Sequence, residues 1–165
     1  MNGAGAPADV VVPDRGRYWE DFGVGQTFRH HWGRTLTAGE AVQFATSTMN
    51  TNPLHSNAEY ARARGHRDLV VDPLFVWNIV FGLSVEDLSF KVWGAGNLGY
   101  PRIAFEAAVH PGDTVTARSE VLAKGEWGSG QPDRGVVHVH TEGFKQDGAR
   151  VVDYERKILV QKRPA

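Results

Sequence analysis

Apolar and polar residues alternate in patterns that change along the chain. Residues 26–36 mix aromatic side chains, threonine and histidine in a way that suits a strand. Thr37 and Glu40, three residues apart, then match a capping box, and the apolar positions after them recur at helical spacing. This pattern predicts a strand followed by a helix over residues 38–49.

The next segment predicts a tight connection and a second helix. Pro53 prevents a helix at its own position, while Ser56 and Glu59 match a second capping box that opens a short helix, which Gly65 ends. His55 is therefore expected between two helices, where the geometry of its side chain is well fixed.

A third helix is predicted from Asp72, as N-cap, and Pro73, at the first helical position. The residues that follow, through Phe81, are apolar on nearly every side of the helix. A helix of this kind is expected to be buried.

From about residue 95 the pattern becomes one strand after another. Apolar residues alternate with polar ones over residues 103–107, 115–121, 137–141 and 152–160, with turn sequences between them. One strand, then helices, then about four antiparallel strands predict an α+β fold, with a curved antiparallel sheet wrapped around a central buried helix. We expect a flexible tail over residues 1–16 and a single domain over residues 17–165.

Composition limits the classes of partner. The 165 residues suit one domain, and 18 basic against 19 acidic side chains argue against an electrostatic grip on nucleic acid or on an anionic membrane. Cysteine is absent, which excludes disulfides, thiolate metal sites and a cysteine nucleophile. The first dozen residues do not read as a signal peptide, and no run of about 18 apolar residues is present, so a soluble cytoplasmic protein is expected.

The connection between the first two helices carries the candidate chemistry. It holds Asn50, Asn52, Pro53 and His55 within six residues, beside the helix expected to be most buried. Asparagine and proline favour turns, so an ordinary surface turn is one reading. The other is catalysis, because histidine moves protons near neutral pH and polar groups that converge on an apolar helix form binding pockets.

These residues resemble a family. The segment Met49-Asn50-Thr51-Asn52-Pro53-Leu54-His55, the stretch YWEDFGVGQTF at residues 18–28 and the segment Asn97-Leu98-Gly99 resemble the MaoC-like dehydratases, the R-specific enoyl-CoA hydratases of the hot-dog fold. The match is to the branch that acts on small branched or dicarboxylic acyl-CoAs such as itaconyl-, mesaconyl- or methylglutaconyl-CoA. The resemblance covers roughly residues 18–162 and implies the hot-dog fold independently of the pattern above.

The resemblance implies reversible addition of water across the 2,3 double bond of an acyl-CoA thioester. His55 matches the histidine of the family motif directly, but Asn50 stands where the family commonly has aspartate, and an amide cannot take a proton. Our hypothesis is that His55 alone moves the proton while Asn50 orients the water. We place Asn52 among the residues that contact the substrate.

A second departure concerns the thioester carbonyl. In the family a backbone N–H at the start of the buried helix polarises this carbonyl, whereas Pro73 stands where glycine is common and has no N–H. The donor is therefore expected to be the amide of Leu74 or Phe75, in the first turn of the helix. Asp72 lies beside this position, and we favour an N-cap over an acid as its main role. We place Asp72, Asn97 and Gly99 among the residues expected to line the substrate site.

A carboxylate on the substrate would need a cationic partner. Arg102, next to Asn97 and Gly99, and Arg67 are candidates, because guanidinium groups bind carboxylates and phosphates through two hydrogen bonds. The alternative for each arginine is a solvated surface side chain.

The remaining histidines predict no metal site and no cofactor. His138 and His140 share one face of a strand but lack an evident third ligand, and His30 and His31 point to opposite faces of theirs. The expected partner is an acyl-CoA or acyl-carrier-protein thioester, bound by a homodimer or a higher homo-oligomer that covers the sheet edges. Two rival functions remain on the same fold: an acyl-CoA thioesterase and a non-catalytic acyl-thioester binding protein.

Overall fold

The computed structural model describes residues 16–128 and 130–164, so the tail predicted over residues 1–16 lies outside them except for Gly16. The elements are a 3₁₀ turn η1 (Trp19–Asp21), β1 (Thr27–Thr35), α1 (Ala38–Ser47), a 3₁₀ turn η2 (Pro53–His55), α2 (Ala58–Ala63), α3 (Pro73–Val85), a π-helical turn η3 (Glu86–Phe90), β2 (Gly96–Phe105), β3 (Thr114–Glu126), β4 (Arg134–Lys145) and β5 (Arg150–Gln161).

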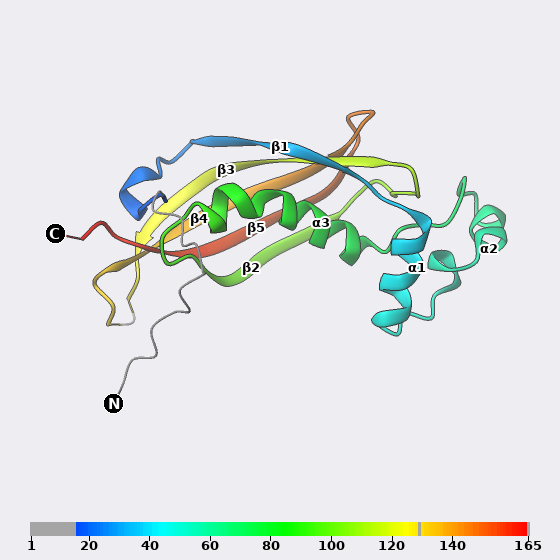
Figure 1. Ribbon diagram of the computed structural model, residues 1–165, viewed down its shortest axis with the longest axis horizontal. Coiled ribbons are helices and arrows are strands. Elements are labelled where there is room, and N and C mark those ends of the chain that lie inside the picture. The colour runs from blue at the N-terminus through cyan, green and yellow to red at the C-terminus, as the bar shows by residue number, and fades with distance from the viewer. Residues whose placement is uncertain (1–15, 129, 165) are drawn as a thin grey trace, which may run out of the picture.

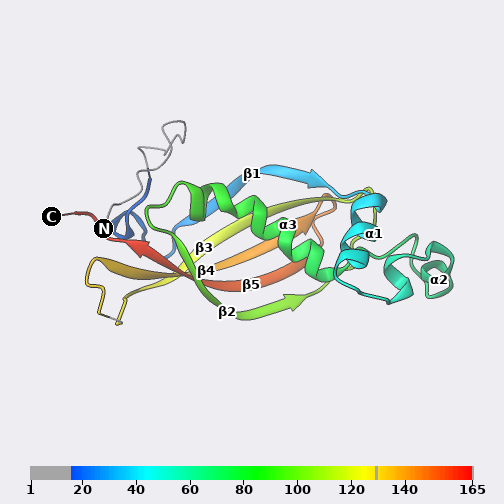
Figure 2. The same cartoon turned by 60° about the horizontal axis from the view of Figure 1, so that its bottom comes forward.

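The five strands form one antiparallel sheet in the spatial order β1-β3-β4-β5-β2. Figure 1 shows α3 lying along one face of this curved sheet, with α1 and α2 beyond one end of it. The same arrangement is visible in the turned view of Figure 2. The predicted α+β fold, a hot-dog fold with its sheet wrapped around a long helix, is confirmed.

Helix α3 packs closely on the sheet because small and β-branched residues face each other. Val76 and Val80 are buried against the strands, and Gly143 of β4 lies directly beneath Val80. A Cβ atom at residue 143 would stand 2.5 Å from Val80 Cγ2 and 3.0 Å from Val152 Cγ1. The glycine therefore sets the short distance between helix and sheet.

The prediction that α3 is buried holds for one side of the helix only. The sheet covers only one side of the helix, so Leu74 is 51% exposed and several other apolar residues of α3 are only partly buried. The 18-residue segment Pro73–Phe90 has a mean hydropathy of 1.2 and is long and apolar enough to cross a membrane. Core helices of soluble proteins often have the same length and hydropathy. In this fold the segment is the helix on the sheet.

The helix caps are confirmed at two positions and corrected at one. Thr37 Oγ1 accepts a hydrogen bond from the Glu40 amide at 3.3 Å, and Glu40 Oε2 accepts one from the Thr37 amide at 3.1 Å, which completes the capping box of α1. Asp72 caps α3 as predicted. The second box is wrong: Ser56 still belongs to the preceding turn, and Asn57 caps α2.

Candidate functional site

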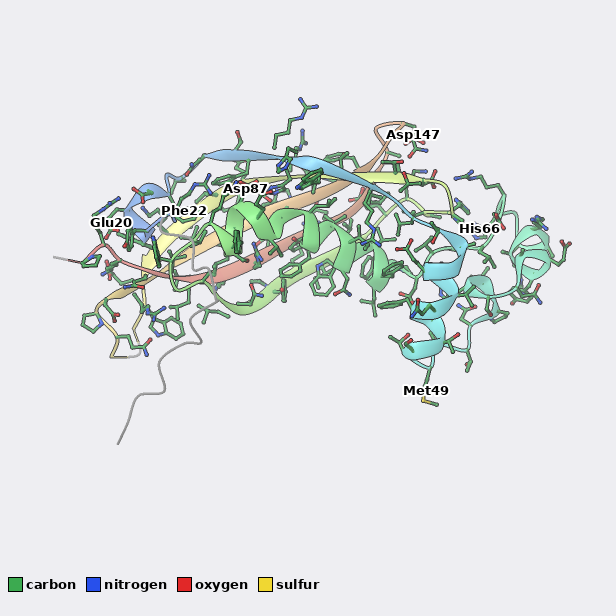
Figure 3. All side chains as sticks on the ribbon, viewed as in Figure 1. Glu20, Phe22, Met49, His66, Asp87 and Asp147 are labelled. Carbon is green, nitrogen blue, oxygen red and sulfur yellow. The ribbon has the colours of Figure 1, made fainter. Side chains whose placement is uncertain are left out.

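The chain reverses direction where α1 ends. Met49 adopts φ of 55°, in the left-handed region that non-glycine residues rarely occupy, and its side chain is 85% exposed. Figure 3 shows Met49 pointing away from the rest of the protein. The Asn50 amide donates to the Ala45 carbonyl at 2.8 Å, and this hydrogen bond closes the turn at the end of α1.

The two asparagines of the motif organise this turn. Asn50 Oδ1 accepts a hydrogen bond from the Asn52 amide at 3.1 Å, and Asn52 Oδ1 accepts one from the Leu54 amide at 3.1 Å. Asn52 thereby caps the 3₁₀ turn η2, which Pro53 begins. The side chain of Asn52 has a structural task here, and its contact with a substrate stays a prediction.

His55 is held in one tautomer. Its ring is buried, and Nδ1 lies 2.7 Å from the carbonyl oxygen of Val70. Because a carbonyl can only accept, Nδ1 carries the hydrogen, and the neutral ring leaves Nε2 as an unprotonated acceptor. The Val70 amide also donates to the Leu54 carbonyl at 2.9 Å, which fixes the ring's partner in place. A positioned imidazole with a free Nε2 can act as a general base.

Asp72 brings a carboxylate into the same corner. It is buried, its Oδ1 accepts from the Leu74 amide at 2.8 Å, and its Oδ2 accepts from Asn50 Nδ2 at 2.6 Å. Sequence analysis identified the cap but missed the contact with Asn50, 22 residues earlier. The sequence indicates only that Asn50 follows the end of α1 and that Asp72 begins α3.

The first turn of α3 leaves one backbone donor available. The Leu74 amide already donates to the Asp72 carboxylate, and the Val76 amide donates to the Asp72 carbonyl at 3.1 Å. Within residues 16–128 and 130–164 no hydrogen bond uses the amide of Phe75. This amide is therefore the donor that the start of α3 offers to a ligand.

The two arginines suggested by the sequence are engaged elsewhere. Arg102 Nη1 lies 2.5 Å from Asp153 Oδ1 on the face of the sheet opposite α3, and Arg67 Nη2 lies 2.7 Å from Asp113 Oδ1. Neither guanidinium joins the corner formed by Asn50 and His55. Alternation alone did not reveal this, because a bulge between Gly99 and Arg102 shifts the register of β2.

Asn97 and Gly99 lie on the same edge strand, β2. Gly99 has φ of 152° and forms part of an irregularity in the pairing with β5, and Asn97 Oδ1 accepts a hydrogen bond from Arg156 Nη1 at 3.4 Å. Arg156 is a residue that the sequence reasoning missed as a functional candidate. The sequence does contain a sign of this role, because Arg156 is a charged residue in the core-facing row of β5, between Tyr154 and Ile158.

Two histidine clusters lie outside the corner. His30 is buried and bonds Asp87 Oδ2 through Nδ1 and Ser119 Oγ through Nε2, both at 2.9 Å, whereas His31 is exposed, so the opposite orientation of the pair is confirmed. Burial lowers the pKa of His30, against the opposing pull of Asp87. This hydrogen-bonded chain ties β1 to η3 and β3.

His140 belongs to an ionic network on the outer face of the sheet. One ligand atom from each of His140, Glu142 and Asp153 lies within 4.8 Å of the others. Arg102 and Arg150 both contact Asp153, and Arg150 also contacts Glu142 at 2.8 Å. The guanidinium groups compensate these carboxylates, so the cluster gives no support to a cation site.

The chain is similar in sequence to known acyl-CoA hydratases and dehydratases. A family model described as mesaconyl-CoA hydratase matches residues 8–165. Over 148 residues the chain is 37% identical to the mesaconyl-CoA hydratase of Cereibacter sphaeroides, a match that covers 90% of this chain and 42% of that protein. It is 36% identical to the β-methylmalyl-CoA dehydratase of Chloroflexus aurantiacus, with 90% and 41% covered.

A solved structure agrees with these relatives. A MaoC domain protein dehydratase from Chloroflexus aurantiacus superimposes with a TM-score of 0.82 and 34% identity, over 94% of this chain and 43% of that one. The chain thus spans about two fifths of the length of these three proteins.

Proposed function

The chain belongs to the mesaconyl-CoA hydratase family, and on this premise we propose that it carries the hydro-lyase site of an acyl-CoA hydratase or dehydratase. The reaction is the reversible addition of water across the 2,3 double bond of a short enoyl thioester, with a branched or dicarboxylic acyl group. The relatives named for mesaconyl-CoA and β-methylmalyl-CoA support this choice of substrate class.

The observation that carries the proposal is the tautomer of His55. The Val70 carbonyl holds the hydrogen on Nδ1, so Nε2 is the ring nitrogen that remains to act as the base. In hydration, Nε2 removes a proton from water as the oxygen bonds to C3 of the enoyl group, and the electron pair moves to the thioester oxygen. The proton then passes to C2, which completes the addition.

Asn50 orients the water in this scheme. One hydrogen of its Nδ2 group is held by Asp72, and its Oδ1 is held by the Asn52 amide, so the amide plane is fixed and the second N–H points in one direction. Asp72 acts as a positioning residue, because its charge strengthens the hydrogen bond that holds Asn50. His55 remains the group that transfers the proton.

Phe75 supplies the donor for the thioester carbonyl. Its amide lies in the first turn of α3, where the positive end of the helix dipole favours developing negative charge. Negative charge builds on the thioester oxygen as water adds, so a preorganised N–H there lowers the barrier. The missing N–H of Pro73 does not matter in this arrangement, because the donor is the amide of Phe75, two residues later.

Exposed apolar surface supports a homodimer or a pairing with a second hot-dog domain. The edge strand β2 leaves Ile103 37% and Phe105 44% exposed, and the outer side of α3 exposes Leu74. An uncovered edge strand beside an apolar helix invites a partner strand. We propose that such a partner covers this edge in a soluble, cytoplasmic protein, with the acyl-CoA or acyl-carrier-protein thioester bound at the boundary.

The test is an incubation of the purified protein with crotonyl-, mesaconyl-, itaconyl- and methylglutaconyl-CoA in water enriched in heavy oxygen. The expected result is a mass gain of one labelled water in the acyl group for at least one thioester. Mass spectrometry also identifies the acyl class that is turned over.

Two outcomes would contradict the proposal. Release of free CoA thiol with the enoyl absorbance unchanged would identify a thioesterase. Tight binding of the thioesters without any mass change would identify a non-catalytic binding protein.

A further inference from the structure

Arg156 of β5 carries a charge without a counter-ion. The residue is fully buried on the face of the sheet that α3 covers. Its Nη1 makes one long hydrogen bond, 3.4 Å to Asn97 Oδ1, and the Tyr100 side chain is a second polar neighbour. Nε and Nη2 make no well-formed hydrogen bond, and no described residue forms an ion pair with Arg156. Arginine stays protonated in proteins, so this burial costs free energy unless an anion joins it.

Aromatic rings surround the guanidinium. Its central carbon lies 5.0 Å from the centre of the Phe81 ring. The rings of Trp77, Tyr100 and Tyr154 complete a connected group, with Trp77 5.0 Å from Tyr100 and 6.1 Å from Tyr154. We call Arg156 and these four aromatic residues the Arg156 cluster. Its rings offer the cation π-faces but no formal negative charge.

Further donors in the cluster lack acceptors. Trp77 Nε1 is buried without a partner, like Nε and Nη2 of Arg156, and the Tyr154 hydroxyl, which lies beside Ser84 and Thr141, makes no well-formed hydrogen bond. Of the five buried side-chain atoms without a partner in the described part of the chain, four belong to this cluster and can donate a hydrogen bond. Four donors without an acceptor match an anionic oxygen ligand.

The interior carboxylate near this region is already occupied. Asp87 lies in the turn that follows α3 (Figure 3), and its Oδ2 contacts His30 Nδ1 at 2.9 Å. It forms no ion pair with Arg156 among the described residues. The described residues therefore supply no anion that matches the cluster.

The outer members of the cluster are partly exposed. Arg156 and Tyr154 are fully buried, while Trp77, Phe81 and Tyr100 are only partly buried, and Asn97 is exposed on the edge strand β2. A ligand that enters along this edge meets the aromatic rings first and the guanidinium beneath them.

The spacing of Phe75 and Phe81 along α3 is comparable with the length of a short diacid. Phe75 and Phe81 are six residues apart on α3, about 9 Å along the helix axis. A four-carbon acyl group spans about 4 Å between its end carbons. A hydrogen bond of about 3 Å at each end extends its reach to about 10 Å.

We propose that the Arg156 cluster binds the free carboxylate of a dicarboxylic acyl thioester while the Phe75 amide binds the thioester carbonyl of the same molecule. Trp77 and Tyr154 donate to the carboxylate beside the guanidinium. The proposal rests on the proposed function, since it names the group that distinguishes the preferred substrate from other enoyl thioesters. Arg156 is a specificity-determining residue and takes no part in proton transfer.

The first experiment compares Arg156→Met with a matched control, Arg118→Met, whose arginine pairs with Glu142 on the outer face of the sheet. Steady-state kinetics are measured with mesaconyl-CoA, which has the second carboxylate, and with crotonyl-CoA, which lacks it. Arg156→Met should lower kcat/KM for mesaconyl-CoA by about 30- to 1000-fold and for crotonyl-CoA by less than about 3-fold. Arg118→Met should change neither value by more than about 3-fold.

A second readout separates recognition from structural support. If Arg156 served packing alone, its replacement would destabilise the unliganded protein. Because an unpaired buried charge is costly, Arg156→Met should instead leave the melting temperature unchanged or raise it. Tyr154→Phe, which removes only a hydroxyl, should lower the preference for mesaconyl-CoA over crotonyl-CoA and keeps the test available if Arg156→Met does not fold.

Three outcomes would overturn the proposal. They are equal losses on both thioesters in Arg156→Met, an unchanged substrate preference in Tyr154→Phe, and equal affinity of the wild type for both thioesters in equilibrium binding. Binding is measured separately from turnover. If the wild type hydrates none of the thioesters, the proposed hydratase function is contradicted. If Arg156→Met then still lowers the affinity for mesaconyl-CoA, the carboxylate site remains supported.

Discussion

Asp72 Oδ2 accepts a hydrogen bond from Asn50 Nδ2 at 2.6 Å, across 22 residues of sequence. The amide that replaces the common acid of the motif is therefore in contact with a buried carboxylate from the start of α3. The motif's lost carboxyl group is thus replaced, in contact with Asn50, by a carboxyl group from the start of α3.

Asp72→Asn tests this contact. Asparagine caps helices about as well as aspartate, so the melting temperature should change little. The new amide cannot accept from both Leu74 and Asn50 in the present geometry, and the loss of a charged acceptor should lower kcat by about 10- to 100-fold with a small change in KM. Stopped-flow hydration of the accepted enoyl-CoA measures both constants. An unchanged kcat would show that Asp72 is only a cap.

His55→Asn tests the base. The asparagine amide can still donate to the Val70 carbonyl, as Nδ1 does now, but it offers no atom with the basicity of Nε2. We expect kcat/KM for hydration to fall by about two to four orders of magnitude while the protein stays folded. His31→Asn, at an exposed histidine of β1, is the control and should retain activity. Full activity in the His55 variant would exclude the proposed role.

The sequence predicted contacts between close neighbours better than contacts across the chain. The capping box of Thr37 and Glu40 and the cap at Asp72 depend on residues within three positions, and both are confirmed. The cap of α2 was misplaced by one residue, because Ser56 and Asn57 can both accept the same kind of bond and the turn before them decided between the two.

Long-range partners could not be read from local patterns. The contact of Asn50 with Asp72 depends on how α1 and α3 end in space, and the pairing of Arg102 with Asp153 depends on the bulges of β2. Arg156 stood in a core-facing row of alternating residues, which was a visible conflict between charge and burial. Only the structure shows that no described residue resolves this conflict.

Pro73→Ala tests where the oxyanion donor stands. Alanine restores an N–H at the first position of α3, next to the Leu74 amide that Asp72 already holds. If Phe75 is the donor, kcat should stay within about 2-fold, while the lost rigidity of proline should lower stability by about 0.4–1 kcal/mol. Kinetics and thermal unfolding on one preparation provide both numbers. A several-fold rise in kcat would instead place the donor at position 73.

Asp113 predicts a loss of stability in acid. Burial would raise the pKa of its carboxyl, but hydrogen bonds from Gln146, the His110 amide and Arg67 outweigh this and hold the pKa below its ordinary value. Because the folded-state pKa is the lower one, the stabilisation is complete above the unfolded pKa of about 4 and is lost as the pH falls through the folded value.

Asp113→Asn should remove part of this dependence. The free energy of unfolding in urea, measured from pH 2 to pH 7, should fall less steeply below about pH 4 in the variant than in the wild type. Glu142 and Asp153 also have lowered pKa values, so some slope remains. Identical slopes in the two proteins would contradict the role of Asp113. Since Arg67 stands just before α3, the variant should also loosen the segment that presents Asp72.

Gly143→Ala tests the spacing between α3 and the sheet, on which the reach from Phe75 to Arg156 depends. The added methyl group would stand 2.5 Å from Val80 Cγ2, so the helix or the strand has to move. Overpacking of this kind costs about 1–3 kcal/mol of unfolding free energy. Gly125→Ala in β3, where a Cβ meets nothing within 4 Å, is the matched control and should cost less. Because the shift would tilt α3 relative to Arg156, mesaconyl-CoA hydration should suffer more than crotonyl-CoA hydration. An equal free energy of unfolding in the two alanine variants would show that α3 can accommodate the added methyl group without cost.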